Sequence, residues 1–332
     1  IAAQLSSGQD ELQQICERAA ALSKADLVTG IVGEFPELQG IMGGEYALHD
    51  GESPAVAQAI REQYLPKAIE GELPKMLAGQ ILSLADRLDT IAAFFHVGIV
   101  PTGSEDPFAL RRHATAIVRI VIEGNLRINF GTCIDHAMGI VTKDGFKGAS
   151  GLELEGRRRI TEFIFERVRH YGRIMYALRD DVIESVLKPV HDTVIDLVDL
   201  IRKMKALEAA MRKPEFDSLI VGFKRAHRLV EKEQWERRPV DAAMFQHPSE
   251  PALHKAVENE RGRIEDSVKT GEYSRALNAL VGLKPSVDAF FEAVMVNAED
   301  KAIRSNRLSL LKEVDELFMS FADFSQIVVQ GR

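Results

Sequence analysis

The stretch that decides the fold runs from Lys75 to Glu123 and reads KMLAGQILSLADRLDTIAAFFHVGIVPTGSEDPFALRRHATAIVRIVIE. Apolar residues in its first half recur every three or four positions, which is typical of one helical face; they are Ile81, Leu84, Ala85, Leu88, Ile91, Ala92 and Phe95. Gly98 ends this helix, and the following PTGS segment predicts a turn. Ser104 or Asp106 then caps a second helix, because a side-chain oxygen accepts a backbone N–H without an intrahelical partner. The stretch therefore predicts a helical hairpin with a charged elbow.

The rest of the chain also reads as helical, and no convincing period-two strand occurs in it, so we expect an all-α fold. The expected helices span 10–22, 25–32, 54–64, 126–141, 154–178, 180–187, 190–211, 214–232, 249–268, 272–296 with a break at 282–285, and 300–321. The glycine-rich segment 142–156 predicts a domain boundary. We therefore expect a helical domain over 1–150, a basic connector over 151–189 and a five-helix bundle over 190–332.

The composition is ordinary for a globular protein, with 332 residues, 45% hydrophobic and 28% charged. No apolar run approaches the ~20 residues that cross a bilayer, and the N-terminal segment does not resemble a signal peptide. Cys16 and Cys133 make no ligand-spaced pair, so free thiols in a cytoplasmic protein are expected, with no membrane partner. The start at Ile1 rather than Met predicts a truncated chain.

The charge is distributed unevenly along the chain. A net charge of −8 argues against a general nucleic-acid binder, and we expect no DNA partner. Segment 151–240 nevertheless carries more basic than acidic residues, whereas the remainder is acidic. Any RNA contact should therefore be local and directed by shape.

Three blocks of the sequence, in this order, resemble one family. They are KADLVTGIVGEFPELQGIMGGEYA at 24–47, LADRLDTIAAFFHVGIVPTGSEDPFALRRHA within the hairpin, and FFEAVMVNAEDKAIRSNRLSLL at 290–311. All three are similar to the beta subunit of the bacterial heterotetrameric glycyl-tRNA synthetase. The resemblance implies an HD-like helical domain followed by an anticodon-binding (DALR-like) bundle. It also implies that a large N-terminal half of the subunit is missing from this chain.

A basic stripe in the bundle is the main candidate site. Its residues are Lys224, Arg225, Arg228 and Lys232, within FKRAHRLVEK, which resembles the anticodon-domain helix of class I synthetases and of this beta subunit. Guanidinium groups grip phosphates bidentately and stack on unpaired bases, which suits RNA. The alternative is a solvated helix face. Arg304, Asn306 and Arg307 match another basic turn of that domain, although Arg307 could instead pair with Glu299 or Asp300.

Four arginines nearer the N-terminus are further candidates for contact with tRNA or a partner subunit. Arg111 and Arg112 follow the elbow, and Arg157 and Arg158 begin the basic connector. The alternative for the first pair is a set of ion pairs to Glu105, Asp106 or Asp89.

Metal sites are weakly indicated. His49-Asp50 is an HD dipeptide, and Asp86 or Asp89 follows at a plausible interval, but no histidine precedes His49 as the first ligand of an HD phosphohydrolase. Asp50 also suits a turn. Cys133, Asp135 and His136 have no second cluster nearby, so a buried cysteine with polar neighbours is the preferred interpretation. We expect no metal and no catalytic residue in this chain.

The resemblance implies that this chain is the tRNA-binding part of a glycine–tRNA ligase. It would bind tRNA(Gly) and the alpha subunit in an α2β2 assembly, and position the tRNA for ATP-dependent aminoacylation by alpha. ATP and Mg would be used by the holoenzyme, and the chain alone, which shows no ATP-binding motif, should be inactive. Two alternatives stay open: an HD-type metal-dependent phosphohydrolase, and a non-catalytic helical scaffold.

Overall fold

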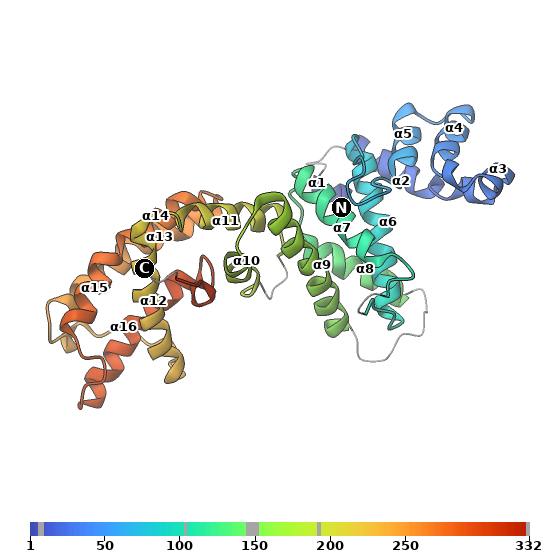
Figure 1. The fold of residues 1–332 in the computed structure, drawn as a ribbon. Coiled ribbons are helices and arrows are strands. Elements are labelled where there is room, and N and C mark those ends of the chain that lie inside the picture. The colour runs from blue at the N-terminus through green and yellow to red at the C-terminus, as the bar shows by residue number, and fades with distance from the viewer. Residues whose placement is uncertain (6–9, 103–104, 144–152, 191–193, 330–332) are drawn as a thin grey trace. The chain divides into compact units, whose positions relative to one another are not determined.

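The Lys75–Glu123 stretch forms two packed helices, α6 (Leu77–His96) and α7 (Leu110–Glu123) (Figure 1). The computed structural model describes residues 1–5, 10–102, 105–143, 153–190 and 194–329. Gly98, at φ +85°, follows the end of α6, as predicted. The carboxylate of Asp106 accepts hydrogen bonds from the backbone N–H groups of Leu110 (2.7 Å) and Arg111 (3.0 Å), so it caps α7 as expected, whereas Ser104 lies outside the described residues.

The chain divides into two compact units. Unit 1 comprises Ile1–Tyr171 with Asp192–Val198, and unit 2 comprises Gly172–His191 with Asp199–Arg332. The division falls within α9 (Glu153–Tyr176), whereas the glycine-rich segment 142–156 had predicted a boundary before this helix. Residues 144–152 of that segment lie outside the described residues.

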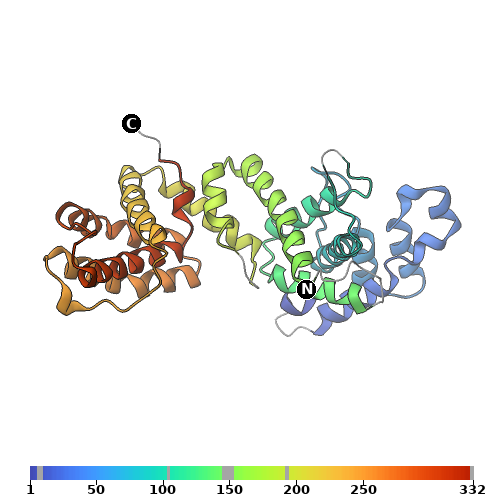
Figure 2. The ribbon, with the colours of Figure 1, turned by 90° about the horizontal axis from the view of Figure 1, so that it is seen from below.

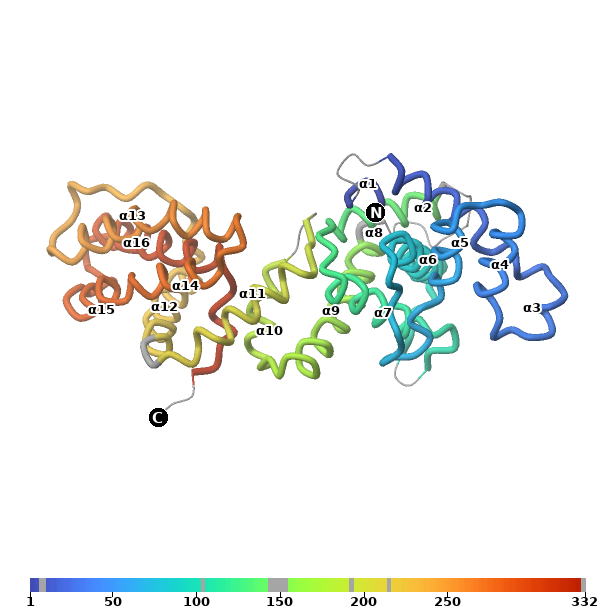
Figure 3. Tube along the Cα trace, turned by 90° about the horizontal axis from the view of Figure 1, so that it is seen from above, coloured from blue at the N-terminus to red at the C-terminus, as the bar shows by residue number. Residues whose placement is uncertain are grey.

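Unit 1 is built around α6, which packs against α2, α5, α7 and α8 (Figure 3). Its other helices are α1 (Ala2–Leu5), α2 (Asp10–Leu22), η1 (Ala25–Val28), α3 (Gly30–Glu34), η2 (Pro36–Leu38), α4 (Ile41–His49), α5 (Pro54–Glu62), α8 (Phe130–Lys143) and most of α9. The single helix expected over 25–32 is wrong, because Thr29 is extended (ψ 147°) and separates η1 from α3. Ser53 caps α5 by accepting from the Val56 N–H at 3.3 Å, as such a residue should.

Unit 2 holds α10 (Asp180–Leu187), most of α11 (Leu197–Ala210), α12 (Pro214–Lys232), η3 (Ala242–Met244), α13 (Ser249–Lys269), α14 (Tyr273–Gly282), α15 (Lys284–Ala293), α16 (Lys301–Met319) and η4 (Phe324–Gln326). In Figure 2 the yellow α12 lies beside the red α16, against which it packs. The predicted break of the fourth bundle helix is confirmed, since α14 ends at Gly282 and α15 begins at Lys284.

The all-α prediction is confirmed. No strand occurs within the described ranges, where the only β-type pairing is an isolated bridge between Thr102 and Glu105. Among the same residues no helix has the length and apolarity needed to cross a bilayer.

Two adjacent glycines let α4 approach α5 closely. A Cβ added at Gly43 would lie 2.9 Å from Ile60 Cγ2, and one added at Gly44 would lie 2.4 Å from Arg61 Cγ and 2.9 Å from the carbonyl oxygen of Ala57. Real Cβ atoms are not found this close to a backbone oxygen, so any larger residue must push the helices apart. The absence of side chains at these two glycines is therefore what allows the close approach of α4 to α5.

A buried ion pair fastens the first turn of α13 to α16. The Arg307 guanidinium donates to Glu250 at 2.8 Å and to the carbonyl oxygen of Met295 at 2.9 Å, and the side chains of the pair are 9% and 1% exposed. Glu250 also accepts from the backbone N–H groups of Gln246 (2.6 Å) and His247 (2.8 Å). Burial alone would raise the pKa of Glu250, but the hydrogen bonds from Arg307, His247 and Gln246 outweigh it and hold the pKa below its ordinary value.

We predict that Gly44→Ala destabilises the chain by about 1–3 kcal/mol, the usual cost of overpacking a fitted contact. Gly33→Ala in α3 is the matched control. Nothing lies within 4 Å of a Cβ there, so the substitution should be neutral or should stabilise by up to about 1 kcal/mol. Urea unfolding of both variants measures the difference, and equal stabilities would contradict the close-contact interpretation.

We predict that the Glu250–Arg307 pair makes the stability of this chain fall in acid. The folded-state pKa of Glu250 is depressed, so its contribution is complete above its ordinary pKa of 4.5 and is lost as the pH falls through the folded value. Glu250→Gln should cost about 3 kcal/mol at pH 7, because it leaves Arg307 buried without a counter-charge. Its deficit relative to wild type should shrink below pH 4.5.

The control is Arg263→Met, which removes the exposed Arg263–Glu260 pair (3.0 Å) on α13 and should cost less than about 1 kcal/mol. Thermal unfolding between pH 3 and pH 7 tests both variants. If the stability difference between Glu250→Gln and wild type stayed constant across that range, protonation of Glu250 would not explain the loss of stability in acid.

Candidate nucleic-acid interface

The candidate site lies on the exposed side of α12. The apolar face of this helix is buried, through Phe216, Leu219, Ile220, Phe223, Ala226 and Val230. Arg225, Arg228 and Lys232 are exposed on the other side, and Lys224 is half-buried at its edge. The four predicted cations therefore share one side of a helix whose other side is fixed by packing.

Two of the four cations are held in place by neighbouring segments. The Lys224 ammonium donates to the backbone carbonyl oxygen of Ile327 at 2.5 Å. The Arg225 guanidinium lies over the ring of Phe291, 4.4 Å from its centroid, in a cation–π contact between α12 and α15. These contacts set the direction of both side chains without neutralising their charge.

In the described part of the chain, the positive charge of Lys224 and Arg228 is not balanced by an ion pair. Within the described residues neither side chain forms a salt bridge to a carboxylate. Burial lowers the pKa of Lys224, and the nearby Arg228 lowers it further, against the opposing effect of Asp181 and Asp323. Two like charges held close together favour a bound anion.

An apolar hollow of about 800 Å³ lies directly beside these cations. Lys224, Arg225 and Arg228 line one side of it, and Val294, Met295 and Val296, which follow α15, line another. Met295 is 77% exposed, whereas the two valines are buried. The site therefore combines cationic groups with accessible apolar surface, a combination found where proteins bind single-stranded nucleic acid.

The second predicted group, on α16, is engaged within the protein. The buried Asn306 carboxamide accepts from the Asp241 N–H (2.8 Å) and donates to the Asp241 carbonyl oxygen (3.0 Å). Arg307 pairs with Glu250 rather than with Glu299 or Asp300. Arg304 is half-buried and pairs with Glu233, the residue after α12, at 2.6 Å. These side chains fasten α16 to the segments after α12, and they are not part of its exposed cationic side.

The four arginines predicted nearer the N-terminus lie in unit 1. Three of them each contact a different residue in the described chain, and these contacts do not form one cluster. Arg111 donates to the carbonyl oxygen of Glu105 at 3.5 Å within the elbow, whereas Arg112 is exposed. Arg157 pairs with Asp135 at 2.6 Å, and Arg158 pairs with Glu155 at 3.2 Å with 79% of its side chain exposed.

The HD-type residues are not assembled into a metal site. His49 and Asp50 are exposed at the end of α4, where their side chains are 88% and 76% accessible and contact each other at 3.1 Å. Asp86 instead pairs with Lys24 at 2.9 Å. No group of three or more potential metal ligands occurs in the part of the chain that the structure describes.

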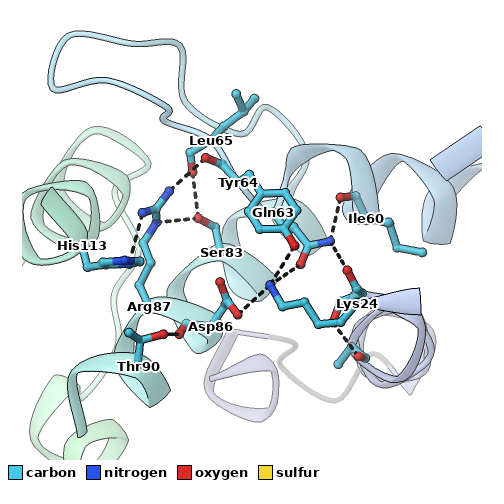
Figure 4. Close-up of polar contacts among 12 residues, drawn as sticks. Lys24, Ile60, Gln63, Tyr64, Leu65, Ser83, Asp86, Arg87, Thr90 and His113 are labelled. Atoms are coloured by element: carbon cyan, nitrogen blue, oxygen red, sulfur yellow. Dashed lines mark hydrogen bonds and ion pairs between the residues drawn. The ribbon is translucent and has the colours of Figure 1, made fainter. Parts of the chain in front are cut away.

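Asp86 belongs to a polar network that fastens the segment after α5 to α6 (Figure 4). The Lys24 ammonium reaches Asp86, the side-chain oxygen of Gln63 (3.2 Å) and the hydroxyl of Tyr64 (3.1 Å). The neighbouring Arg87 donates to the carbonyl oxygen of Tyr64 at 3.1 Å and to that of Pro66 at 3.2 Å. The carboxylate therefore has a structural role here.

The Cys133 group has the structural character expected of it. Cys133 is buried and its thiol accepts from the Gln4 amide at 3.6 Å, while burial raises its pKa. Asp135 forms an ion pair with Arg157, and His136 is exposed. The arrangement favours neither a metal ligand nor a reactive thiolate.

Sequence reasoning missed the residues that complete the hollow. Val294, Met295 and Val296 read as an apolar helix end, and Ile327, which receives the Lys224 ammonium, lies about a hundred positions further along the chain. The only signal was the resemblance of segment 290–311, which contains the first three.

Two parts of the chain match models of known protein families. Residues 1–188 match the family model described as glycyl-tRNA synthetase beta subunit, and residues 219–323 match that of the DALR anticodon binding domain. The second match contains the exposed cations of α12 and the apolar edge that faces them.

Curated relatives match over nearly the whole chain. The glycine–tRNA ligase beta subunit of Geobacter sp. (strain M21) is 42% identical over 311 residues, which is 94% of this chain and 44% of the relative. The beta subunit of Myxococcus xanthus (strain DK1622) is 42% identical over 315 residues, which is 94% of this chain and 44% of the relative. The beta subunit of Janthinobacterium sp. (strain Marseille) is 40% identical over 316 residues, which is 95% of this chain and 43% of the relative. The chain thus spans less than half the length of these relatives. Because the family model covers more than half of this chain, the chain belongs to the glycyl-tRNA synthetase beta subunit family.

Proposed function

We propose that this chain is the tRNA-binding part of a glycine–tRNA ligase beta subunit. Unit 2 holds tRNA(Gly) by its anticodon arm, and the alpha subunit carries out ATP-dependent aminoacylation. The role of the beta chain is positional, because holding the tRNA in one geometry converts an encounter between three reactants into a nearly unimolecular step. This role is cytoplasmic, and the ATP and Mg are used by the α2β2 holoenzyme.

The observation that carries the proposal is the exposed cationic side of α12. It lies inside the segment that matches an anticodon binding domain, and its Lys224 and Arg228 have no carboxylate partner among the described residues. An accessible apolar hollow adjoins them. Phosphates and unpaired bases present complementary groups: negative oxygens for the cations and flat apolar faces for the hollow.

The remaining candidates take second place in the proposal. Arg304, Asn306 and Arg307 support the interface indirectly, because they fasten α16 to the segments that follow α12. Arg112 and Arg158 are exposed, so in unit 1 they are the residues best placed to contact tRNA or the alpha subunit.

We predict that Arg228→Ala weakens binding of tRNA(Gly) and lowers the slope of log affinity against log salt by about one, since one phosphate contact is lost. Arg225→Ala should weaken binding as well. The matched control is Arg275→Ala on α14, which removes an exposed arginine paired with Glu272 at 3.0 Å and should leave the slope unchanged. Filter binding across a salt series measures all three variants.

The same titration with an anticodon-swapped tRNA(Gly) tests which part of the tRNA is held. Weaker binding of the swapped tRNA supports the anticodon arm. Equal and poor binding of both tRNAs, with no effect of the arginine variants, would favour the helical scaffold instead.

We predict that the chain alone catalyses neither glycine-dependent ATP–pyrophosphate exchange nor charging of tRNA(Gly), since its sequence carries no ATP-binding motif. Both assays are run with an intact α2β2 enzyme as the positive control. Activity of the chain by itself would assign it a catalytic role that the proposal denies.

A further inference from the structure

Exposed apolar side chains gather in one corner of unit 1, which is built from η1, α3 and α4. Val28, which ends η1, is 90% exposed, and Phe35, directly after α3, is 44% exposed. Ile31 is exposed four positions before Phe35, and Ile41 and Leu48 are exposed seven positions apart on α4. Single exposed apolar residues are common on protein surfaces, but a group of them marks an interaction surface. We call these five residues the apolar corner.

The corner is exposed because α3 lies at the outer end of unit 1. In Figures 1 and 3 this helix stands beyond α4 and α5, away from α6. It packs against η1 and η2, and its buried residue is Val32. A Cβ added at Gly30 or Gly33 would meet no atom within 4 Å. In the described part of unit 1, this side of α3 is therefore left open to a partner.

Hydrogen bonds hold the corner in a fixed shape. The carboxylate of Asp26, which is 1% exposed, accepts from the backbone N–H groups of Gly40 (2.6 Å) and Gly43 (3.0 Å), and so joins η1 to the start of α4. The hydroxyl of Thr29 donates to the carbonyl oxygen of Asp26 at 2.7 Å. A partner therefore meets a preformed surface, and little conformational entropy is lost in ordering it on binding.

The charge of this region determines what kind of partner fits. Residues 25–50 include five acidic residues and no lysine or arginine. Glu45 is paired with an arginine of α5 at 2.7 Å, but Glu34 and Glu37, on either side of Phe35, are exposed and form no ion pair within the described residues. A negative rim repels the phosphates of RNA and attracts a protein surface that carries cations around an apolar centre. The corner therefore suits a protein partner rather than the tRNA.

We propose that the apolar corner is the docking surface for the alpha subunit, which meets it with an apolar centre and a basic rim. The inference rests on the proposed function, because that function makes alpha the protein partner of this chain. By this assignment unit 1 holds a protein through apolar contacts, whereas unit 2 holds tRNA through cations. The two contacts differ in chemistry and in the residues that make them, so each can be weakened without the other.

The affinity of the chain for purified alpha subunit tests the proposal. Val28→Ser should weaken this affinity roughly 5- to 30-fold, which is typical of truncating a side chain at the centre of an interface. The control is Ile140→Ser, which changes a residue of α8 that is 42% exposed in unit 1 but lies outside the corner, and it should leave the affinity unchanged. Biolayer interferometry with immobilised alpha measures both variants, and an unchanged unfolding temperature confirms that Val28→Ser keeps the fold.

A second pair of variants tests the negative rim. Glu34→Lys and Glu37→Lys should each slow association with alpha at low salt, since exposed charges act mainly on the association rate. Their difference from wild type should shrink as the salt concentration rises. Glu265→Lys on α13, which makes the same change of charge at an exposed residue of unit 2, is the control. Equal association rates of all three variants would contradict the basic rim proposed for alpha.

The outcomes separate this inference from the proposed function. If alpha binds the wild-type chain and Val28→Ser equally well, or does not bind the chain at all, the docking surface is wrong, and binding of tRNA(Gly) still decides the tRNA role. If Val28→Ser instead weakens tRNA(Gly) binding, or dissociates a dimer of the chain in sedimentation, the corner binds RNA or a second copy and the proposal is wrong. If the wild-type chain binds alpha through the corner but does not bind tRNA(Gly), the tRNA role falls and the docking surface stands.

Discussion

The packing of Phe223, Phe318 and Phe324 is the interaction on which the cationic side of α12 depends. The ring centroids of the first two lie 4.9 Å apart, and Phe324 contacts both. In an α-helix, a residue two positions after a buried one is turned by about 200°. Arg225 and Arg228 follow the buried Phe223 and Ala226 by two positions, so burial of that face turns both arginines outward. The aromatic contact thus determines where the charge is displayed.

Most of the fold could be predicted from the sequence because its signals are local. The apolar periodicity of 214–232, the serine before Pro54 and the aspartate before Lys301 each act within a few residues, and α12, α5 and α16 begin where these signals place them. The division of 25–32 between η1 and α3 was missed, since it depends on an extended Thr29 that no apolar pattern marks. Local patterns predict helices well and interruptions poorly.

The candidate site was predicted less completely, because its geometry depends on contacts between distant segments. The four cations of α12 were predicted as a group from their spacing on one helix side and from the resemblance of their segment, and the structure places them on one side of α12. The roles of Asn306 and Arg307 were not, because their partners Asp241 and Glu250 lie about sixty positions earlier and nothing in a basic turn distinguishes a buried arginine from an exposed one. For the HD dipeptide, the sequence held residue types that suit a metal site, but their arrangement does not form one. Asp86 forms an ion pair with Lys24 instead.

The contact between Arg225 and Phe291 has a consequence for the thermodynamics of recognition. A free arginine side chain loses about 2 kcal/mol of rotamer entropy when it becomes fixed. Here the guanidinium is already restrained over an aromatic ring in a different helix, so much of this loss occurs during folding. In the proposed RNA interface, Arg225 therefore belongs to an ordered surface, and selectivity there comes from the shape of the partner more than from adjustment of the protein.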